Sequence, residues 1–363
     1  MSEQAQKENN SGLIMWLNQQ SLPIRLGAFI AFVVLIVVLI IALTVGLYYF
    51  NVSNFPRLEP VAIFDDVRVS EYVTFDDEEA YPGAVASASD GTLYTGSYQH
   101  GAVWRVAPDG TPAELPETRS QVGSVIGLDV GADGALYILD HLEAFSQSGA
   151  RVWVWRDETL DLLLDTTINA DVVLVSKPND IAVDDSGRVY LLDIALGQVL
   201  LLEDGAWRIW WSAPDESYQV AGLAYDAPNQ ALIIADAGRN ALYRLALNVP
   251  DAEAERQTIF EYDSTNQEPP RFNGVAVGED GLLYVASLGR NEIWEINGAE
   301  ATHRAIAGNY RGSSDVAYDP QQARLYVNNW DQSWLIPITL VVMQVDIPPR
   351  LPFSVDVIDL QAP

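Results

Sequence analysis

Cysteine is absent from this chain of 363 residues, and lysine and histidine are scarce. There are two Lys (Lys7 and Lys177) and three His, against 50 Asp and Glu residues. Without cysteine, the chain cannot be a disulfide scaffold, a zinc finger or an iron–sulfur protein. The formal charge of −30 argues against nucleic-acid binding, because phosphate groups are attracted by basic surfaces. No G-x-S-x-G, H-E-x-x-H or P-loop motif occurs, so no motif names a substrate.

One long apolar run lies near the N-terminus. Leu26–Phe50 is a stretch of 25 residues without a charge, and as a helix it would span roughly 37 Å, enough for a ~30 Å hydrocarbon core. It is longer than the apolar region of a cleaved signal peptide, and no A-x-A-like site follows it. Tyr48 and Tyr49 at its end are typical of an interfacial aromatic belt. We therefore expect an uncleaved signal anchor over residues 26–50, preceded by a cytoplasmic tail of residues 1–25.

Charges on the two sides of this run indicate its orientation. Lys7 and Arg25 precede it, whereas Asp65, Asp66 and further acidic residues follow it. The positive-inside rule therefore favours an N-terminus inside the cell. We expect a single-pass protein of the cell membrane whose main domain is extracytoplasmic, and the absence of cysteine fits such a domain in a bacterium.

The rest of the chain repeats one pattern six times. Each copy is a short apolar strand, a tight turn and a second apolar strand, as in Asn273–Tyr284, and a third strand follows in most copies, as in Ala102–Val106. The period of two within the strands excludes a helical solenoid. Four short strands in each 40–50 residues are typical of propeller blades. We predict an all-β fold, a six-bladed β-propeller over residues 80–363. The copies begin at Gly83, Ile126, Asn179, Ala221, Asn273 and Ser314.

Glycine-containing pairs mark the tight turns between the strands of most copies. The pairs supply the positive φ that a hairpin needs. They are Asp90-Gly91, Asp133-Gly134, Ser186-Gly187 and Asp280-Gly281.

The two ends of the domain also contain predicted strands. Residues 51–79 form a linker with lead-in strands at Ala62–Phe64 and Arg68–Val73, and Leu335–Leu360 also has strand character. Either end of the chain could complete the last blade, and the sequence leaves both alternatives open.

The repeats resemble the six-bladed calcium-dependent phosphotriesterase superfamily. That group includes strictosidine synthase-like proteins, the senescence marker protein/gluconolactonase family and the paraoxonases. Pro82–Gly96 resembles the first blade of strictosidine synthase-like proteins, while Lys177–Asp184 and Phe272–Ala276 resemble the family's metal-contacting strand starts. The order of elements, a short inner tail followed by one membrane span and then a propeller, is similar to that of the adipocyte plasma membrane-associated protein. The resemblance covers about residues 60–345. It implies the fold, whereas a shared fold does not by itself establish the chemistry.

The first residue of each copy is expected at one mouth of the central channel, because the first strand should be innermost. The family resemblance implies a calcium ion there, held by a carboxylate of blade one and by Asn or Asp of later blades. Asn179 and Asn273 match that pattern, whereas Gly83 stands where the Glu would be expected. The alternative is that both amides only bond neighbouring blades. Restoring a carboxylate with Gly83→Glu should tighten calcium binding if the site is real, because affinity follows ligand charge.

Three further oxygen donors belong to this candidate metal site. Ser314 begins the sixth copy, and Asp180 and Asp315 directly follow Asn179 and Ser314. Adjacent residues of a strand face opposite sides, so these two carboxylates are expected to point away from the mouth. The resemblance to paraoxonases instead assigns an Asp such as Asp180 to a second, buried calcium. Calcium is thus the one cofactor that the sequence suggests.

Asp140 and His141 end the second strand of blade two, on the same face as the mouth. The position resembles the paraoxonase blade that carries a catalytic His, so the resemblance implies a catalytic pair with His141 as general base. The partner His of that dyad would lie near Ile126, where none occurs. The alternative is an exposed loop histidine. His303 is interpreted as an incidental residue of a peripheral strand.

Two classes of function are consistent with these patterns. One is a calcium-dependent hydrolase of lactones or esters, in which the metal acts as Lewis acid. The other is a non-enzymatic propeller with a degenerate metal site that binds a small molecule or a protein partner at the channel mouth. The missing carboxylate at Gly83 favours the second, and Asn179, Asn273 and His141 favour the first.

Overall fold

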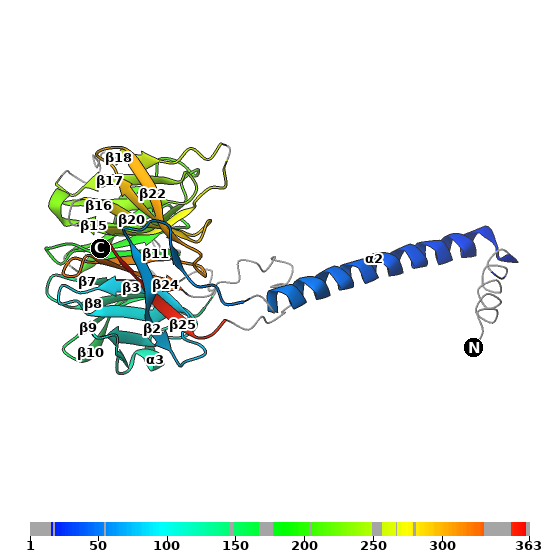
Figure 1. The fold of residues 1–363 in the computed structure, drawn as a ribbon, viewed down its shortest axis with the longest axis horizontal. Helices are drawn as coiled ribbons and strands as arrows, with labels where there is room; N and C mark the ends of the chain where they lie inside the picture. The colour runs from blue at the N-terminus through cyan, green and yellow to red at the C-terminus, as the bar shows by residue number, and fades with distance from the viewer. Residues whose placement is uncertain are drawn as a thin grey trace. The chain divides into compact units, whose positions relative to one another are not determined.

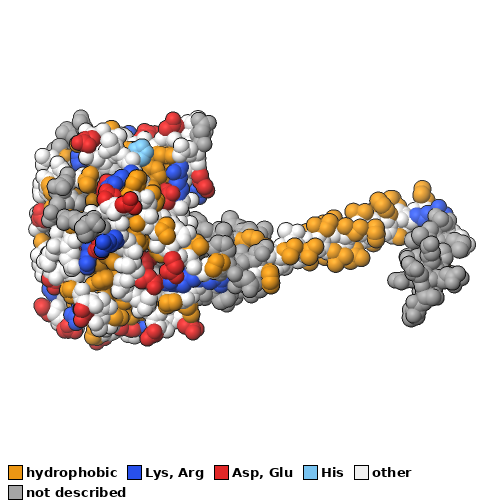
Figure 2. Space-filling model, in the orientation of Figure 1, with side chains coloured by type: hydrophobic (Ala, Val, Ile, Leu, Met, Phe, Trp, Pro, Cys, Tyr) orange, Lys and Arg blue, Asp and Glu red, His pale blue; other side chains and the backbone are white. Residues whose placement is uncertain are grey.

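The computed structural model shows one long helix and a propeller, two compact units that are described separately. The helix, α2 (Leu22–Ser53), contains the predicted span. Its residues Leu22–Tyr48 are long and apolar enough to cross a membrane, and apolar side chains cover its surface in Figure 2. The structure describes residues 16, 19–53, 56–144, 149–166, 177–203, 205–248, 256–265, 267–278, 281–329 and 350–360. Most of the expected cytoplasmic tail, the turn residue Asp280 and residues 335–349 of the expected C-terminal strand region lie outside them.

The first three blades follow the repeats in chain order, four antiparallel strands each. Blade one contains β3 (Pro82–Ser87), β4 (Leu93–Ser97), β5 (Val103–Val106) and β6 (Pro112–Glu114); blade two contains β7 (Ser124–Val130), β8 (Leu136–His141), β9 (Ala150–Arg156) and β10 (Thr159–Asp165); blade three contains β11 (Pro178–Val183), β12 (Val189–Asp193), β13 (Gln198–Glu203) and β14 (Ala206–Ser212). Helix α3 (Thr118–Gln121) connects blades one and two.

The last three blades include the two ends of the domain. Blade four contains β15 (Val220–Asp226), β16 (Ala231–Asp236), β17 (Ala241–Ala246) and β18 (Arg256–Glu261); blade five contains β19 (Phe272–Val277), β20 (Leu283–Ser287), β21 (Glu292–Asn297), β22 (Thr302–Gly308) and β1 (Val61–Ala62); blade six contains β23 (Val316–Asp319), β24 (Arg324–Asn329), β25 (Phe353–Asp359) and β2 (Arg68–Phe75). The 3₁₀ turn η1 (Ala227–Asn229) joins β15 to β16.

The innermost strands form a closed ring, which confirms the predicted six-bladed propeller. Strands β3, β7, β11, β15, β19 and β23 contact one another in that order, and β23 contacts β3 again. Figure 1 shows the propeller with the C-terminal strand β25 (red) beside β2 (blue). Apolar side chains fill the spaces between blades; between blades two and three, for example, Leu139 and Val152 pack with Ile181 and Leu191. Each blade is therefore held by burial against its two neighbours.

Both ends of the domain close the ring. The C-terminal strand β25 pairs with β24, and the lead-in strand β2 then pairs with β25, with Phe75 opposite Phe353. The two alternatives left open by the sequence are thus realised together in blade six. The earlier lead-in strand β1 pairs with β22 and adds a fifth strand to blade five. Residues 57–75 are consequently built into the propeller at two places.

Candidate channel-mouth site

The structure brings the five candidate metal ligands together around one cavity. A cavity of about 100 Å³ at the channel mouth is lined by Asn179, Asp180, Asn273, Ser314 and Asp315. These residues come from blades three, five and six, and Gly83 and Ile126 of blades one and two also line it, together with Tyr98, Gly274 and Leu288. Five of the six first residues of the repeats therefore meet at the mouth, as the innermost position of the first strand implied, whereas Ala221 of blade four is not among the lining residues.

A β-bulge explains why Asn179 and Asp180, which are adjacent in sequence, share this cavity. The pairing of β11 with β12 shifts between Pro178 and Asp180, so Asn179 is the extra residue. Equivalent shifts occur at Gly83, Ile126 and Ala221. A bulge re-aims the side chain that follows it, and the expectation that Asp180 points away from the mouth was wrong for this reason.

The amides and the hydroxyl of the mouth differ in how far they are engaged. The Asn179 Nδ2 donates to the carbonyl oxygen of Ala221 in blade four, at 2.7 Å, which leaves its Oδ1 for a ligand. The Ser314 Oγ accepts a hydrogen bond from Asn328 Nδ2 at 2.8 Å. Among the described residues, the Asn273 amide has no side-chain hydrogen-bond partner. Asn179 thus acts partly as the inter-blade strut of the alternative interpretation, whereas Asn273 does not.

Asp180 and Asp315 join neighbouring blades through their carboxylates. Asp180 Oδ2 accepts from the backbone N–H of Leu223 at 2.7 Å, and Asp315 Oδ2 accepts from Val85 N–H at 2.9 Å. The sequence analysis missed a third member, Asp129, whose Oδ2 accepts from Val183 N–H at 2.7 Å. Each carboxylate therefore pins its own innermost strand to that of the next blade.

The three carboxylates lie in a weakly solvated, like-charged environment. Burial raises the pKa of Asp129 and of Asp315 to about 7. Burial, followed by the charge of Asp315, raises the pKa of Asp180 well above its usual value. Within the described part of the chain, no Arg or Lys forms an ion pair with any of them. A cation in the channel would therefore favour their ionised forms.

The same three residues line a second cavity further along the channel. This cavity of about 290 Å³ is lined by Asp129, Asp180 and Asp315 together with later residues of the innermost strands, including Ser87 and Tyr225. Asp180 and Asp315 thus stand between the two cavities. A sequence signal for Asp129 existed, because it lies two residues after Gly127, the counterpart of Asp180, and alternate residues of a strand share a side.

Gly83 cannot carry the carboxylate that the resemblance would place there. A Cβ atom at this position would lie 2.7 Å from the carbonyl oxygen of Val125 and 3.1 Å from the Tyr98 Cβ. Any side chain at 83 would have to displace the backbone of blade two. We therefore expect Gly83→Glu to destabilise the propeller rather than to tighten calcium binding.

Asp140 is fully buried and held by the core of blade two. Its carboxylate accepts hydrogen bonds from Gly123 N–H at 2.5 Å and Trp153 Nε1 at 3.1 Å, and it pairs with Arg151 Nη2 at 2.8 Å. Asp193 and Asp236 occupy the same place in blades three and four and also bond the backbone before their blade's first strand. Fastening that segment to the end of the second strand is thus a repeated role of this position.

His141 is buried rather than exposed in a loop. Its Nε2 lies 2.8 Å from the carbonyl oxygen of Pro178 in blade three, so this nitrogen carries the proton. Its Nδ1 is buried without a hydrogen-bond partner among the described residues. Burial lowers the pKa of His141, which favours the neutral imidazole. Neither Asp140 nor His141 lines the mouth cavity.

The donor set of the mouth fits a hard cation. It consists only of amide, hydroxyl and carboxylate oxygens, which are the ligands that calcium prefers. Among the described residues, no three His, Cys, Asp or Glu side chains are grouped as metal ligands. A calcium ion would therefore depend on Asn179, Asn273 and Ser314 alongside Asp180 and Asp315, and its affinity would be modest because few ligands are charged.

Comparisons with known proteins agree with the fold. Residues 82–329 match the model of the SMP-30/gluconolactonase/LRE-like region, and no curated protein sequence is significantly similar to the chain. The structure is similar to a gluconolactonase from Xanthomonas campestris (16% identity, 84% of this chain and 99% of that one, TM-score 0.58). It is also similar to an aldose sugar dehydrogenase from Streptomyces coelicolor (16%, 84% and 100%, 0.54) and to virginiamycin B lyase from Staphylococcus aureus (14%, 73% and 83%, 0.51). The activities in these names differ, and at such low identity the similarity shows the fold alone.

Proposed function

Since the chain belongs to the SMP-30/gluconolactonase/LRE-like family, we propose that its channel mouth binds calcium weakly and, with it, a small oxygen-rich ligand. One observation carries this proposal: the five candidate ligands, which come from three blades, line a single cavity of about 100 Å³. The closer kinship with strictosidine synthase-like proteins that the first blade suggests is part of the same proposal, as is the kinship with paraoxonases that the position of His141 suggests. Calcium would supply a positive charge against the carboxylates of Asp180 and Asp315.

The substitution Asn273→Asp tests the calcium site. It keeps the shape of a side chain that has no hydrogen-bond partner among the described residues and adds one negative charge to the cavity. We expect calcium to raise the melting temperature of the wild type modestly and to bind Asn273→Asp roughly tenfold more tightly. Differential scanning fluorimetry with a calcium titration measures both.

Asn297→Asp is the matched control. Asn297 lies far along β21 from the mouth, and its Oδ1 caps a turn by accepting from Ala299 and Glu300 N–H, a role that Asp retains. Its calcium response should equal that of the wild type. If calcium shifts the melting temperature of neither the wild type nor Asn273→Asp, the metal site does not exist.

Hydrolysis of lactones or esters is the second candidate, favoured by the family and by the carboxyl of Asp315 in the mouth cavity. Bound calcium would polarise the carbonyl group of the substrate. Turnover of a panel of lactones and aryl esters should then stop when calcium is chelated. The variant His141→Gln keeps an N–H donor toward Pro178. If this folded variant loses turnover, Asp140 and His141 are the catalytic pair; if it retains turnover, that pairing is excluded. Absence of turnover across the panel leaves the binding propeller.

Anchoring in the cell membrane by α2, with the propeller outside, is also part of the proposal. The natural absence of cysteine makes the test clean, because single-cysteine variants have no background. An impermeant maleimide applied to intact cells should label Glu300→Cys, on an exposed turn of the propeller, and should label Ser2→Cys only after lysis. The reverse pattern would show that the orientation is wrong, and labelling of the wild type controls for side reactions.

A further inference from the structure

The largest cavity described lies away from the channel, at the rim of the propeller. This groove of about 820 Å³ runs between the outer strands of blades four and five, β18 and β22, and reaches Phe64 beyond β1. It shares no residue with the two channel cavities. Its volume falls in the range of small-molecule sites, roughly 300–1,000 Å³.

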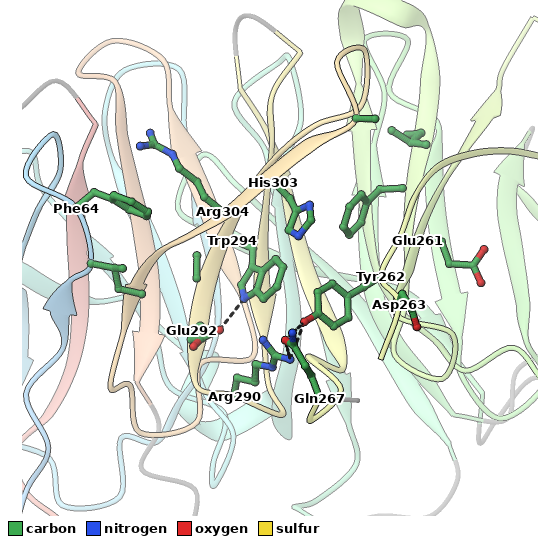
Figure 3. A pocket seen from close by; sticks show the side chains of 15 residues that line it. Phe64, Glu261, Tyr262, Asp263, Gln267, Arg290, Glu292, Trp294, His303 and Arg304 are labelled. Atoms are coloured by element: carbon green, nitrogen blue, oxygen red, sulfur yellow. Dashed lines mark hydrogen bonds between the residues drawn. The ribbon is translucent and has the colours of Figure 1, made fainter. Parts of the chain in front are cut away.

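Aromatic rings form the floor of this rim groove. The imidazole of His303 stacks on Trp294, with ring centroids 5.4 Å apart and planes 4° apart. Tyr262 stands perpendicular to both rings, at 88° and 89°. Trp294 is 4% exposed, and its Nε1 donates to Glu292 at 2.9 Å. His303, which is exposed, therefore presents its outer face on a rigid support (Figure 3). His303, which the sequence analysis interpreted as incidental, is therefore part of the lining of the rim groove.

Planar polar groups surround this floor with both donors and acceptors. Arg290 is fixed by a 3.0 Å bond to Tyr262 Oη and by the carbonyl of Glu268, and its guanidinium lies 5.5 Å from the Trp294 ring. Among the described residues, Arg290 Nη1 and Gln267 Nε2 donate to no protein group. The carboxylates of Glu292 and Asp263 add acceptors. A ligand in the groove thus meets an aromatic face flanked by N–H donors and carboxylate oxygens.

Both arginine and carboxylate side chains line the rim groove, although the chain as a whole carries −30. The arginines are Arg290 and Arg304, of which Arg304 is held in ion pairs with Glu295 and Asp66. A strongly anionic ligand would be repelled by the carboxylates of the lining, and a strongly cationic one by the Arg290 guanidinium beside the aromatic floor. A neutral polyhydroxylated ring avoids both penalties, because its C–H face packs on an aromatic ring while its hydroxyls pair with donors and acceptors. We propose that the rim groove binds a neutral oligosaccharide.

Calorimetric titration of the full chain in lipid nanodiscs tests this proposal, since many detergents carry sugar groups that would compete. The probes are cellotetraose, maltotetraose, mannotetraose and N-acetylchitotetraose. We expect at least one to bind with a dissociation constant on the order of 1 mM or tighter. His303→Ala should weaken it at least fivefold, and Arg290→Gln at least threefold. Both residues are at the surface of the groove, so both variants should fold.

Two controls separate the rim groove from the channel. His100→Ala makes the same change in blade one and should leave binding unaltered. Asn273→Asp changes the channel mouth and should also leave oligosaccharide binding unaltered. The oligosaccharide proposal is therefore tested independently of the calcium proposal. No binding of any probe up to about 20 mM overturns the proposal. Binding that survives both His303→Ala and Arg290→Gln places the sugar elsewhere, and stronger binding of a uronic-acid tetramer overturns the neutral class.

Discussion

Raising the pH from about 5 to about 8 is expected to destabilise the calcium-free protein by several kcal/mol. Burial raises the pKa of Asp129, Asp315 and Asp356 to about 7, whereas carboxyls of the unfolded chain ionise near pH 4. Between these values the folded state holds protons that the unfolded state releases. The stabilising contribution is therefore complete below about pH 4 and is lost as the pH rises through 7, at a cost on the order of 3 kcal/mol per carboxyl.

Thermal unfolding in chelator at several pH values measures this loss, and about 0.5 M salt screens repulsion between surface carboxylates. Calcium should reduce the slope, because a cation near Asp180 and Asp315 favours ionisation. Calcium should not remove the contribution of Asp356 to this pH dependence, because Asp356 lies in β25. Asp129→Asn should reduce the fall in melting temperature with rising pH by the contribution of one carboxyl group. A melting temperature that rises from pH 5 to pH 8 in chelator would contradict the raised pKa values.

Asp140→Ala is expected to cost about 3–5 kcal/mol, because it leaves the partly buried Arg151 guanidinium and the buried Trp153 indole N–H without their acceptor. For a domain of this size, that corresponds to a fall in melting temperature of roughly 6–15 °C. A residue whose main role is catalysis would instead lose activity with little loss of stability. Comparing melting temperatures of the purified proteins distinguishes the two roles.

Asp133→Ala is the matched control in the same blade. Asp133 also pairs with an arginine, Arg156, but both side chains are about half exposed. Exposed pairs of this kind contribute about 0–1 kcal/mol. The variant should therefore lower the melting temperature by only a few degrees. Equal effects of Asp133→Ala and Asp140→Ala would contradict the fastening role of Asp140.

Structural features that depend on residues close together in the sequence were predicted correctly. The apolar run became helix α2, because 25 uncharged residues suit a helix with every backbone group bonded internally. The period of two and the spacing of the copies led to six blades, and Gly91, Gly134, Gly187 and Gly281 have the positive φ expected of their turns. Five of the six first residues of the copies line one mouth, as predicted, because equivalent positions in equivalent blades must face the same way.

Local patterns in the sequence therefore sufficed to predict the blade, its orientation and the residues that reach the channel. Features that depend on neighbours distant in sequence became visible only in the folded structure. It showed that β2 and β25 close the ring together, that bulges turn Asp180 into the mouth, and that Val125 leaves no room for a side chain at Gly83. The rim groove belongs to the same class, because Tyr262, Trp294 and His303 come from two blades and meet only when those blades pack. Periodicity records which way a residue faces along its own strand, whereas packing between strands sets what it touches.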